Sequence, residues 1–131
     1  MCKLTMGNPT LPLQGSFTRQ FAQEWVDAWN SHDLDRILAH YDDDIRLVSP
    51  VARKLLNNDN GVVEGKAALR DYFHRGLKAF PDLQFDLIEV LWGVETIVVY
   101  YANKARGTKT AEVMQLTSAG KVRCVWANYD Q

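Results

Sequence analysis

The stretch that decides the fold runs from Phe21 to Pro50, FAQEWVDAWNSHDLDRILAHYDDDIRLVSP. Phe21, Trp25 and Trp29 recur in it at four-residue spacing, which predicts a helix with an aromatic stripe on one side. A short second helix is expected to begin at Asp33, and a strand is expected to end at Pro50. The stretch therefore predicts helix, turn, helix and strand in close succession.

Two segments near this stretch have less regular patterns. Asp42, Asp43 and Asp44 place three carboxylates together, which suggests either a hard cation or a solvated turn. Their spacing does not match a calcium loop, so the turn is the favoured interpretation. Residues 51–64, VARKLLNNDNGVVE, contain turn residues and two leucines, and we expect a lid over a pocket or a short irregular segment.

The remainder of the chain predicts one helix followed by a sheet. Gly65 opens a third helix that Pro81 closes. Residues 83–92, 96–106, 109–117 and 121–129 have strand composition and are separated by hairpin signals. This order predicts the α+β class, with three helices packed in the concave face of a strongly curved, mostly antiparallel sheet that forms a cone-shaped barrel.

Composition limits the function classes. The chain has 131 residues, with residues 1–15 expected to form a flexible arm and residues 16–131 a single domain. The formal net charge of −1 and the absence of a basic patch argue against nucleic acid as a partner. No apolar run is long enough for a membrane span, and Cys2 and Cys124 form no disulfide framework or metal motif. We expect a cytoplasmic protein with no metal and no cofactor.

Several short motifs in fixed order resemble one known family. They are W-x3-WN-x2-D from Trp25 to Asp33, Tyr41 to Asp44, Pro50, Gly65 to Leu69, Phe80 to Leu83, and Gly120 to Val122. Together they resemble the nuclear transport factor 2-like superfamily, which includes ketosteroid isomerases and SnoaL-type polyketide cyclases. The resemblance covers about Phe17 to Tyr129, and it implies a pocket-bearing fold whose function differs from member to member.

The resemblance also implies positions for catalytic groups. The carboxylate base of the isomerases falls on Ser49, which cannot shuttle a proton near neutral pH. The tyrosine position falls on Trp25, and the protonated acid position falls on Glu112. The isomerase mechanism is therefore not expected, and the SnoaL-type pattern leaves Glu112 as the acid–base candidate.

Strand parity predicts the pocket independently of the family. A two-residue turn at Ala119-Gly120 pairs Glu112 with Ala127, and one at Gly107-Thr108 pairs Glu112 with Asn103. One sheet face then combines apolar side chains with few polar ones, as in small-molecule cavities. With the helix residues added, the predicted pocket consists of Trp25, Trp29, Ser49, Phe73, Tyr101, Asn103, Thr110, Met114, Val125 and Tyr129, with Glu112 as the catalytic candidate.

The opposite sheet face holds Tyr100 and Trp126, which predicts a homodimer through this face. The alternative is that the two faces are reversed and Glu112 is a surface residue.

Three function hypotheses follow. The first is an isomerase- or cyclase-like enzyme acting on a hydrophobic carbonyl compound, with Ser49, Asn103 or Tyr129 positioning the substrate. The second is a non-catalytic binder of a small apolar ligand, and the third is a dimerisation module.

Overall fold

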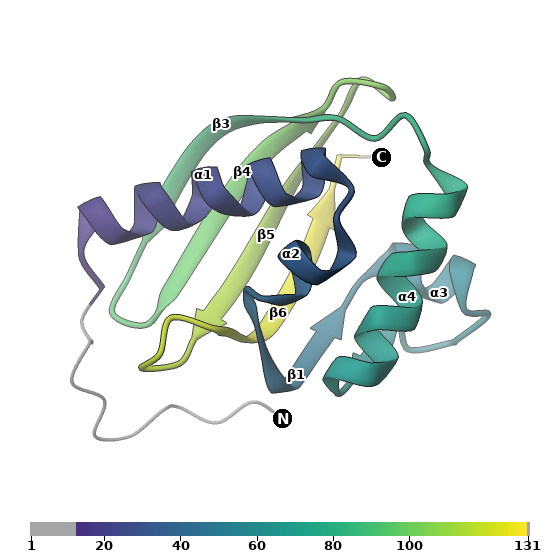
Figure 1. The fold of residues 1–131 in the computed structure, drawn as a ribbon, viewed down its shortest axis with the longest axis horizontal. Helices are drawn as coiled ribbons and strands as arrows, with labels where there is room; N and C mark the ends of the chain where they lie inside the picture. Colours follow the sequence, from purple (N-terminus) through teal and green to yellow (C-terminus); the bar gives the residue numbers. More distant parts are fainter. Residues whose placement is uncertain (1–12, 131) are drawn as a thin grey trace.

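Six strands and four helices make up the computed structural model, which describes residues 13–130 (Figure 1). In chain order they are α1 (Gly15–Ser31), α2 (Leu34–Leu38), β1 (Tyr41–Val48), α3 (Pro50–Leu55), β2 (Val62–Glu64), α4 (Lys66–Ala79), β3 (Phe85–Trp92), β4 (Thr96–Asn103), β5 (Thr108–Leu116) and β6 (Val122–Tyr129). The α+β class and the meander from β3 to β6 agree with the expectations from the sequence.

The strands form one mixed sheet in the order β2-β1-β6-β5-β4-β3. β1 runs parallel to β6, and the other neighbouring pairs are antiparallel. β2 and β3 are the two edges and do not pair, so the expected closure into a strongly curved, cone-shaped barrel is wrong: the sheet is open and not strongly curled (Figure 1). Helices rather than further strand pairing cover its inner face, with α1 packed on β3 and α4 packed on β1.

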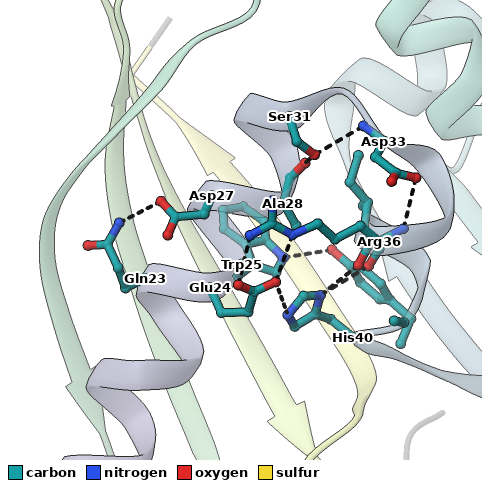
Figure 2. A network of polar contacts seen from close by, with 12 residues as sticks. Gln23, Glu24, Trp25, Asp27, Ala28, Ser31, Asp33, Arg36 and His40 are labelled. Carbon is teal, nitrogen blue, oxygen red and sulfur yellow. Dashed lines mark hydrogen bonds and ion pairs between the residues drawn. The ribbon is translucent and has the colours of Figure 1, made fainter.

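A small polar network fixes the junction between α1 and α2 (Figure 2). Asp33 caps α2 by accepting a hydrogen bond from the Arg36 backbone N–H at 3.3 Å. The Arg36 guanidinium donates to both carboxylate oxygens of Glu24, at 3.0 and 2.9 Å. This pair is exposed and screened by water, so it contributes little stability. In the protein interior, Trp25 Nε1 donates to the Tyr41 hydroxyl at 3.0 Å, and this buried hydrogen bond connects α1 to the start of β1.

Two local expectations differ from the structure. Asp42, Asp43 and Asp44 lie inside β1 instead of a turn, at a register irregularity against β6. Residues 51–64, expected to form a lid or a short irregular segment, contain most of α3 and all of β2. The helix forms because Ser49 accepts a hydrogen bond from the Val51 N–H and Pro50 occupies the first turn, a common start for a helix.

The predicted arm, residues 1–15, falls largely outside the described residues. Its last three residues belong to the folded part of the chain. Leu13 is buried and its N–H donates to the Val94 carbonyl at 3.1 Å, and α1 begins at Gly15. Among residues 13–130, no helix is long and apolar enough to cross a membrane.

Candidate active site

A cavity of about 380 Å³ lies between the inner face of the sheet and helices α3 and α4. Its wall is mainly apolar and aromatic, and Glu112 is its one carboxylic acid. This size and composition are typical of small-molecule sites. The lining residues are Trp29, Leu47, Ser49, Pro50, Val51, Lys54, Leu55, Tyr72, Phe73, Gly76, Phe80, Leu83, Phe85, Tyr101, Asn103, Arg106, Thr108, Thr110, Glu112, Ala127 and Tyr129.

The structure brings most of the predicted pocket residues to this cavity. Those that line it, besides Glu112, are Trp29, Ser49, Phe73, Tyr101, Asn103, Thr110 and Tyr129. Trp25, Met114 and Val125 do not line it, because they are fully buried in the hydrophobic core. Whether the lining residues bind a ligand stays a prediction.

The strand register explains why these residues were placed on the correct face. Glu112 pairs with Ala127, as predicted, but on the other side it pairs with Val99 and not with Asn103. The β4–β5 loop has four residues, Lys104 to Gly107, instead of the predicted two-residue turn. The residue opposite Glu112 therefore lies four positions from the predicted one. An even shift keeps every side chain on its face, because side chains alternate with a period of two. Most residues of the cavity face are buried, whereas most residues of the face with Tyr100 are half-buried or exposed.

The two carboxylate oxygens of Glu112 differ in their hydrogen bonding. Its Oε2 accepts a hydrogen bond of 2.5 Å from the Tyr101 hydroxyl. Tyr101 pairs with Thr110 and is therefore the diagonal neighbour of Glu112 on the same face. Oε1 has no hydrogen-bond partner among the described residues and is not one of the fully covered polar atoms. Since Glu112 is 8% exposed and lines the cavity, this free oxygen faces the cavity.

Burial controls the ionisation of Glu112. Removal of the carboxylate from water raises its pKa to about 7, and the hydrogen bond from Tyr101 opposes this rise. Among residues 13–130 no cation contributes to the shift. At neutral pH the carboxyl is therefore poised between its protonated and ionised forms, which is the condition that favours proton transfer in both directions.

Three tyrosines near Glu112 remain protonated at neutral pH. Burial raises the pKa of Tyr72 to about 12 and the pKa of Tyr129 further, and the Glu112 charge adds to both shifts. Burial and the Glu112 charge also raise the pKa of Tyr101 well above its usual value. The phenols of Tyr72 and Tyr129 line the cavity and are available as neutral hydrogen-bond donors.

Ser49, where the resemblance implied the position of the isomerase base, has a structural role in this chain. It is 3% exposed, and its Oγ accepts the hydrogen bond from Val51 N–H at 3.1 Å that starts α3. The same oxygen lies 3.4 Å from the Tyr129 hydroxyl. Ser49 thus orients Tyr129 and the wall formed by α3.

Two polar atoms next to the cavity have no partner. Trp29 Nε1 and Asn103 Oδ1 are buried without a hydrogen bond in the described part of the chain, although both residues line the cavity. Trp29 is instead held by ring contacts, with centroids 4.7 Å from Phe73 and 5.8 Å from Phe85. An unpaired buried polar atom costs about 1–3 kcal/mol, so these two atoms mark the least satisfied part of the wall.

The sequence analysis missed more than half of the residues that line the cavity. The α3 residues Val51, Lys54 and Leu55 were not predicted to line the cavity, because their segment was expected to form a lid or a short irregular segment. The Ser49-Pro50 pair is the signal that would have revealed this helix. Arg106 was missed because it was expected at the end of a strand, whereas it lies in the loop from Lys104 to Gly107.

Metal ligands are not clustered in the described part of the chain. Among residues 13–130, no three His, Cys, Asp or Glu side chains form a group that could hold a metal ion. Of the three histidines, His32 and His40 contact backbone carbonyls and His74 is exposed.

Comparison with known proteins gives consistent matches to one family. Residues 22–125 match the family model of the SnoaL-like domain. A SnoaL-like protein of unknown function from Burkholderia thailandensis E264 is 35% identical, with a TM-score of 0.86 over 92% of this chain and 99% of that chain. A search of curated protein sequences returned no match.

More distant structures share the fold alone. A protein of the SnoaL-like family from Agrobacterium tumefaciens C58, assigned provisionally as an isomerase, is 17% identical, with a TM-score of 0.69 over 88% of this chain and 99% of that one. AclR from Streptomyces galilaeus, assigned provisionally as a hydroxylase, is 22% identical, with a TM-score of 0.67 over 89% and 77% of the two chains. The different activities in these names mean that the reaction must be argued from the residues of this chain.

Proposed function

Because the chain belongs to the SnoaL-like domain family and has the nuclear transport factor 2-like fold, we propose that it moves a proton on a small, hydrophobic carbonyl compound. Glu112 is the acid–base group of this proposal. One observation carries it: a carboxyl with a pKa of about 7 presents a free oxygen to an apolar cavity while Tyr101 holds the other oxygen.

The proton transfer follows from these positions. Ionised Glu112 takes a proton from the carbon next to the carbonyl, and the electron pair of that C–H bond moves into the enolate. The Tyr72 or Tyr129 hydroxyl donates a hydrogen bond to the enolate oxygen, where the new charge collects. Protonated Glu112 then returns the proton, to the same carbon or to another one. Return to another carbon is an isomerisation, and attack of the enolate on a second carbonyl is a cyclisation.

The test uses a simple ketone, because the natural substrate is not identified. 2-Tetralone has an apolar body and acidic hydrogens beside its carbonyl, and their exchange with D₂O is measured by NMR. We expect the protein to accelerate this exchange and Glu112→Gln to slow the catalysed part by about 100-fold or more. Glu64→Gln changes an exposed glutamate of β2 and is the matched control. Full exchange activity in Glu112→Gln would rule out the proposal.

One observation favours a second candidate, a non-catalytic binder of a small apolar ligand. Ser49 uses its hydroxyl to start α3, so the cavity has one carboxyl and lacks the second acid–base group of the isomerases. In that case 2-tetralone binds, as measured by calorimetry, and its exchange rate equals that of the free ketone.

A homodimer through the outer sheet face is part of the proposal. The features that support it are exposed apolar side chains on that face: Leu91 is 59% exposed and Trp126 is 39% exposed, and half-buried Val98 and Tyr100 lie on the same face. Aromatic side chains on an otherwise apolar sheet surface are common in protein interfaces.

A further inference from the structure

Two basic side chains line a cavity whose single acid is Glu112. Lys54 comes from α3 and Arg106 comes from the β4–β5 loop, so they belong to different parts of the wall. Both residues are exposed, which places their charged ends at the opening and not in the interior. Neither forms an ion pair within the described part of the chain.

Arg106 is held in place by its surroundings. Its guanidinium carbon lies 4.0 Å from the centre of the Phe80 ring, and Phe80 also lines the cavity. The loop that carries Arg106 is tied down by a hydrogen bond of 2.8 Å from Lys104 N–H to the Gln84 carbonyl. The loop and the end of α4 thus lie at the same end of the molecule (Figure 1). A stacked guanidinium keeps its donors in a fixed plane, which suits recognition of a planar carboxylate.

From this arrangement we infer that the ligand is an amphiphile, with an apolar body in the cavity and a carboxylate or similar anion held at the opening by Arg106 and Lys54. The inference rests on the proposed function, because it describes the substrate of the same site. An anion finds two unpaired cations at the opening, whereas a cationic group would be repelled by both. The apolar walls below bind the body of the molecule, and the reacting carbon lies deeper, beside Glu112.

Binding of two matched probes tests the inference. 2-Naphthylacetate carries a carboxylate, and 2-naphthylacetamide is its neutral counterpart of the same shape. Calorimetry at about pH 6 keeps the probe ionised, because ordinary carboxyl groups have pKa values near 4, while Glu112 is largely protonated. We expect the anion to bind about tenfold more tightly than the amide, since two partly exposed charge pairs each contribute modestly. Added salt should reduce this preference.

Charge-neutral variants locate the preference. In the double variant Lys54→Gln/Arg106→Gln, the two probes should bind with nearly equal affinity, with the amide unaffected. Lys104→Gln removes a charge from the same loop but from a residue that does not line the cavity, and it should keep the preference. Equal or absent binding of both probes, or a preference that survives in the double variant, would overturn the inference.

The result is independent of the test of catalysis. Glu112→Gln should keep the preference for the anion while it loses the exchange of 2-tetralone. If the preference is present and exchange does not depend on Glu112, the inference about the ligand stands and the proposed reaction fails. If exchange depends on Glu112 and the probes bind equally, the reverse holds.

Discussion

The carboxyl of Glu112 is subject to two opposing effects. Burial raises its pKa to about 7, and the hydrogen bond from Tyr101 lowers it. In the unfolded chain the same group has an ordinary pKa near 4.5. Between these two values the folded state binds a proton that the unfolded state releases, so the free energy of unfolding falls as the pH rises from about 4.5 to 7.

Replacement of Glu112 by glutamine should therefore stabilise the protein at high pH. Glutamine has the same shape and no charge, so the variant avoids a cost on the order of 3 kcal/mol above pH 7, which follows from the pKa difference. Thermal unfolding should show a higher Tm for Glu112→Gln at about pH 8 and nearly the same Tm as the wild type at about pH 4. The exposed-site control Glu64→Gln should follow the wild type at both pH values. A parallel loss of stability in Glu112→Gln at both pH values would contradict the assignment.

Removal of the Tyr101 hydroxyl should move the pKa of Glu112 upward. Tyr101→Phe deletes the donor that stabilises the ionised form, and burial then acts without opposition. The pH profile of 2-tetralone exchange should shift to higher pH in this variant. Tyr100→Phe alters the neighbouring residue on the outer face and should leave the profile unchanged. A shift toward lower pH in Tyr101→Phe would show that the hydrogen bond does not act as described.

At the scale of elements, α3 depends on a close approach of two backbone segments. Gly61 has a φ of +68°, and a Cβ at this position would lie 2.6 Å from the Ser49 carbonyl oxygen. The Ser49 N–H also donates to the Gly61 carbonyl at 2.9 Å. This contact holds the start of α3 against β2, and with it one wall of the cavity.

A methyl group at Gly61 should loosen that wall. Gly61→Ala should lower the free energy of unfolding by about 1–3 kcal/mol, because the residue has both a left-handed backbone and a steric clash. Gly76→Ala is the matched control: it lies in α4 with no atom within 4 Å of its Cβ, and it should stabilise by up to about 1 kcal/mol. Urea unfolding of both variants measures the difference. Equal stability of the two would show that the approach at Ser49 imposes no constraint.

The sequence predicted most of the elements, including the five-residue helix α2, but it missed α3 and β2. α1, α4 and the four strands of the meander have strong periodic patterns, and the structure has them within a few residues. α3 and β2 were missed because residues 51–64 contain turn residues and show no clear periodic pattern. The β4–β5 register was wrong because Gly107, with its φ of +68°, ends a four-residue loop instead of starting a two-residue one.

For the site, prediction depended on parity. The even register error left Glu112, Thr110 and Tyr101 on the cavity face, but it hid the contact between Tyr101 and Glu112. Depth within a face cannot be read from alternation, and for this reason Met114 and Val125 were placed in the pocket although they lie in the core. The sequence alone predicts the sheet face on which a side chain lies. The packing of the helices on that face determines which of those side chains line the open cavity.

For the whole molecule, we predict that the outer sheet face forms a dimer interface. Trp126 and Leu91 expose apolar area there, and a stable interface buries on the order of 800 Å² from each partner. Trp126→Lys introduces a charge at this face and should shift the sedimentation coefficient from dimer to monomer at micromolar concentration. Val94→Lys changes a residue of the β3–β4 hairpin that is 67% exposed, and it should leave the assembly unchanged. A wild-type protein that sediments as a monomer would refute the dimer.

An NMR titration measures the pKa of Glu112 directly. Labelling of glutamate side-chain carboxyl carbons with ¹³C, with the Glu112 signal assigned by its loss in Glu112→Gln, gives the pKa of this group in the intact protein. We expect a midpoint near pH 7 for Glu112. A midpoint at or below about 4.5, the ordinary value for glutamate, would contradict it.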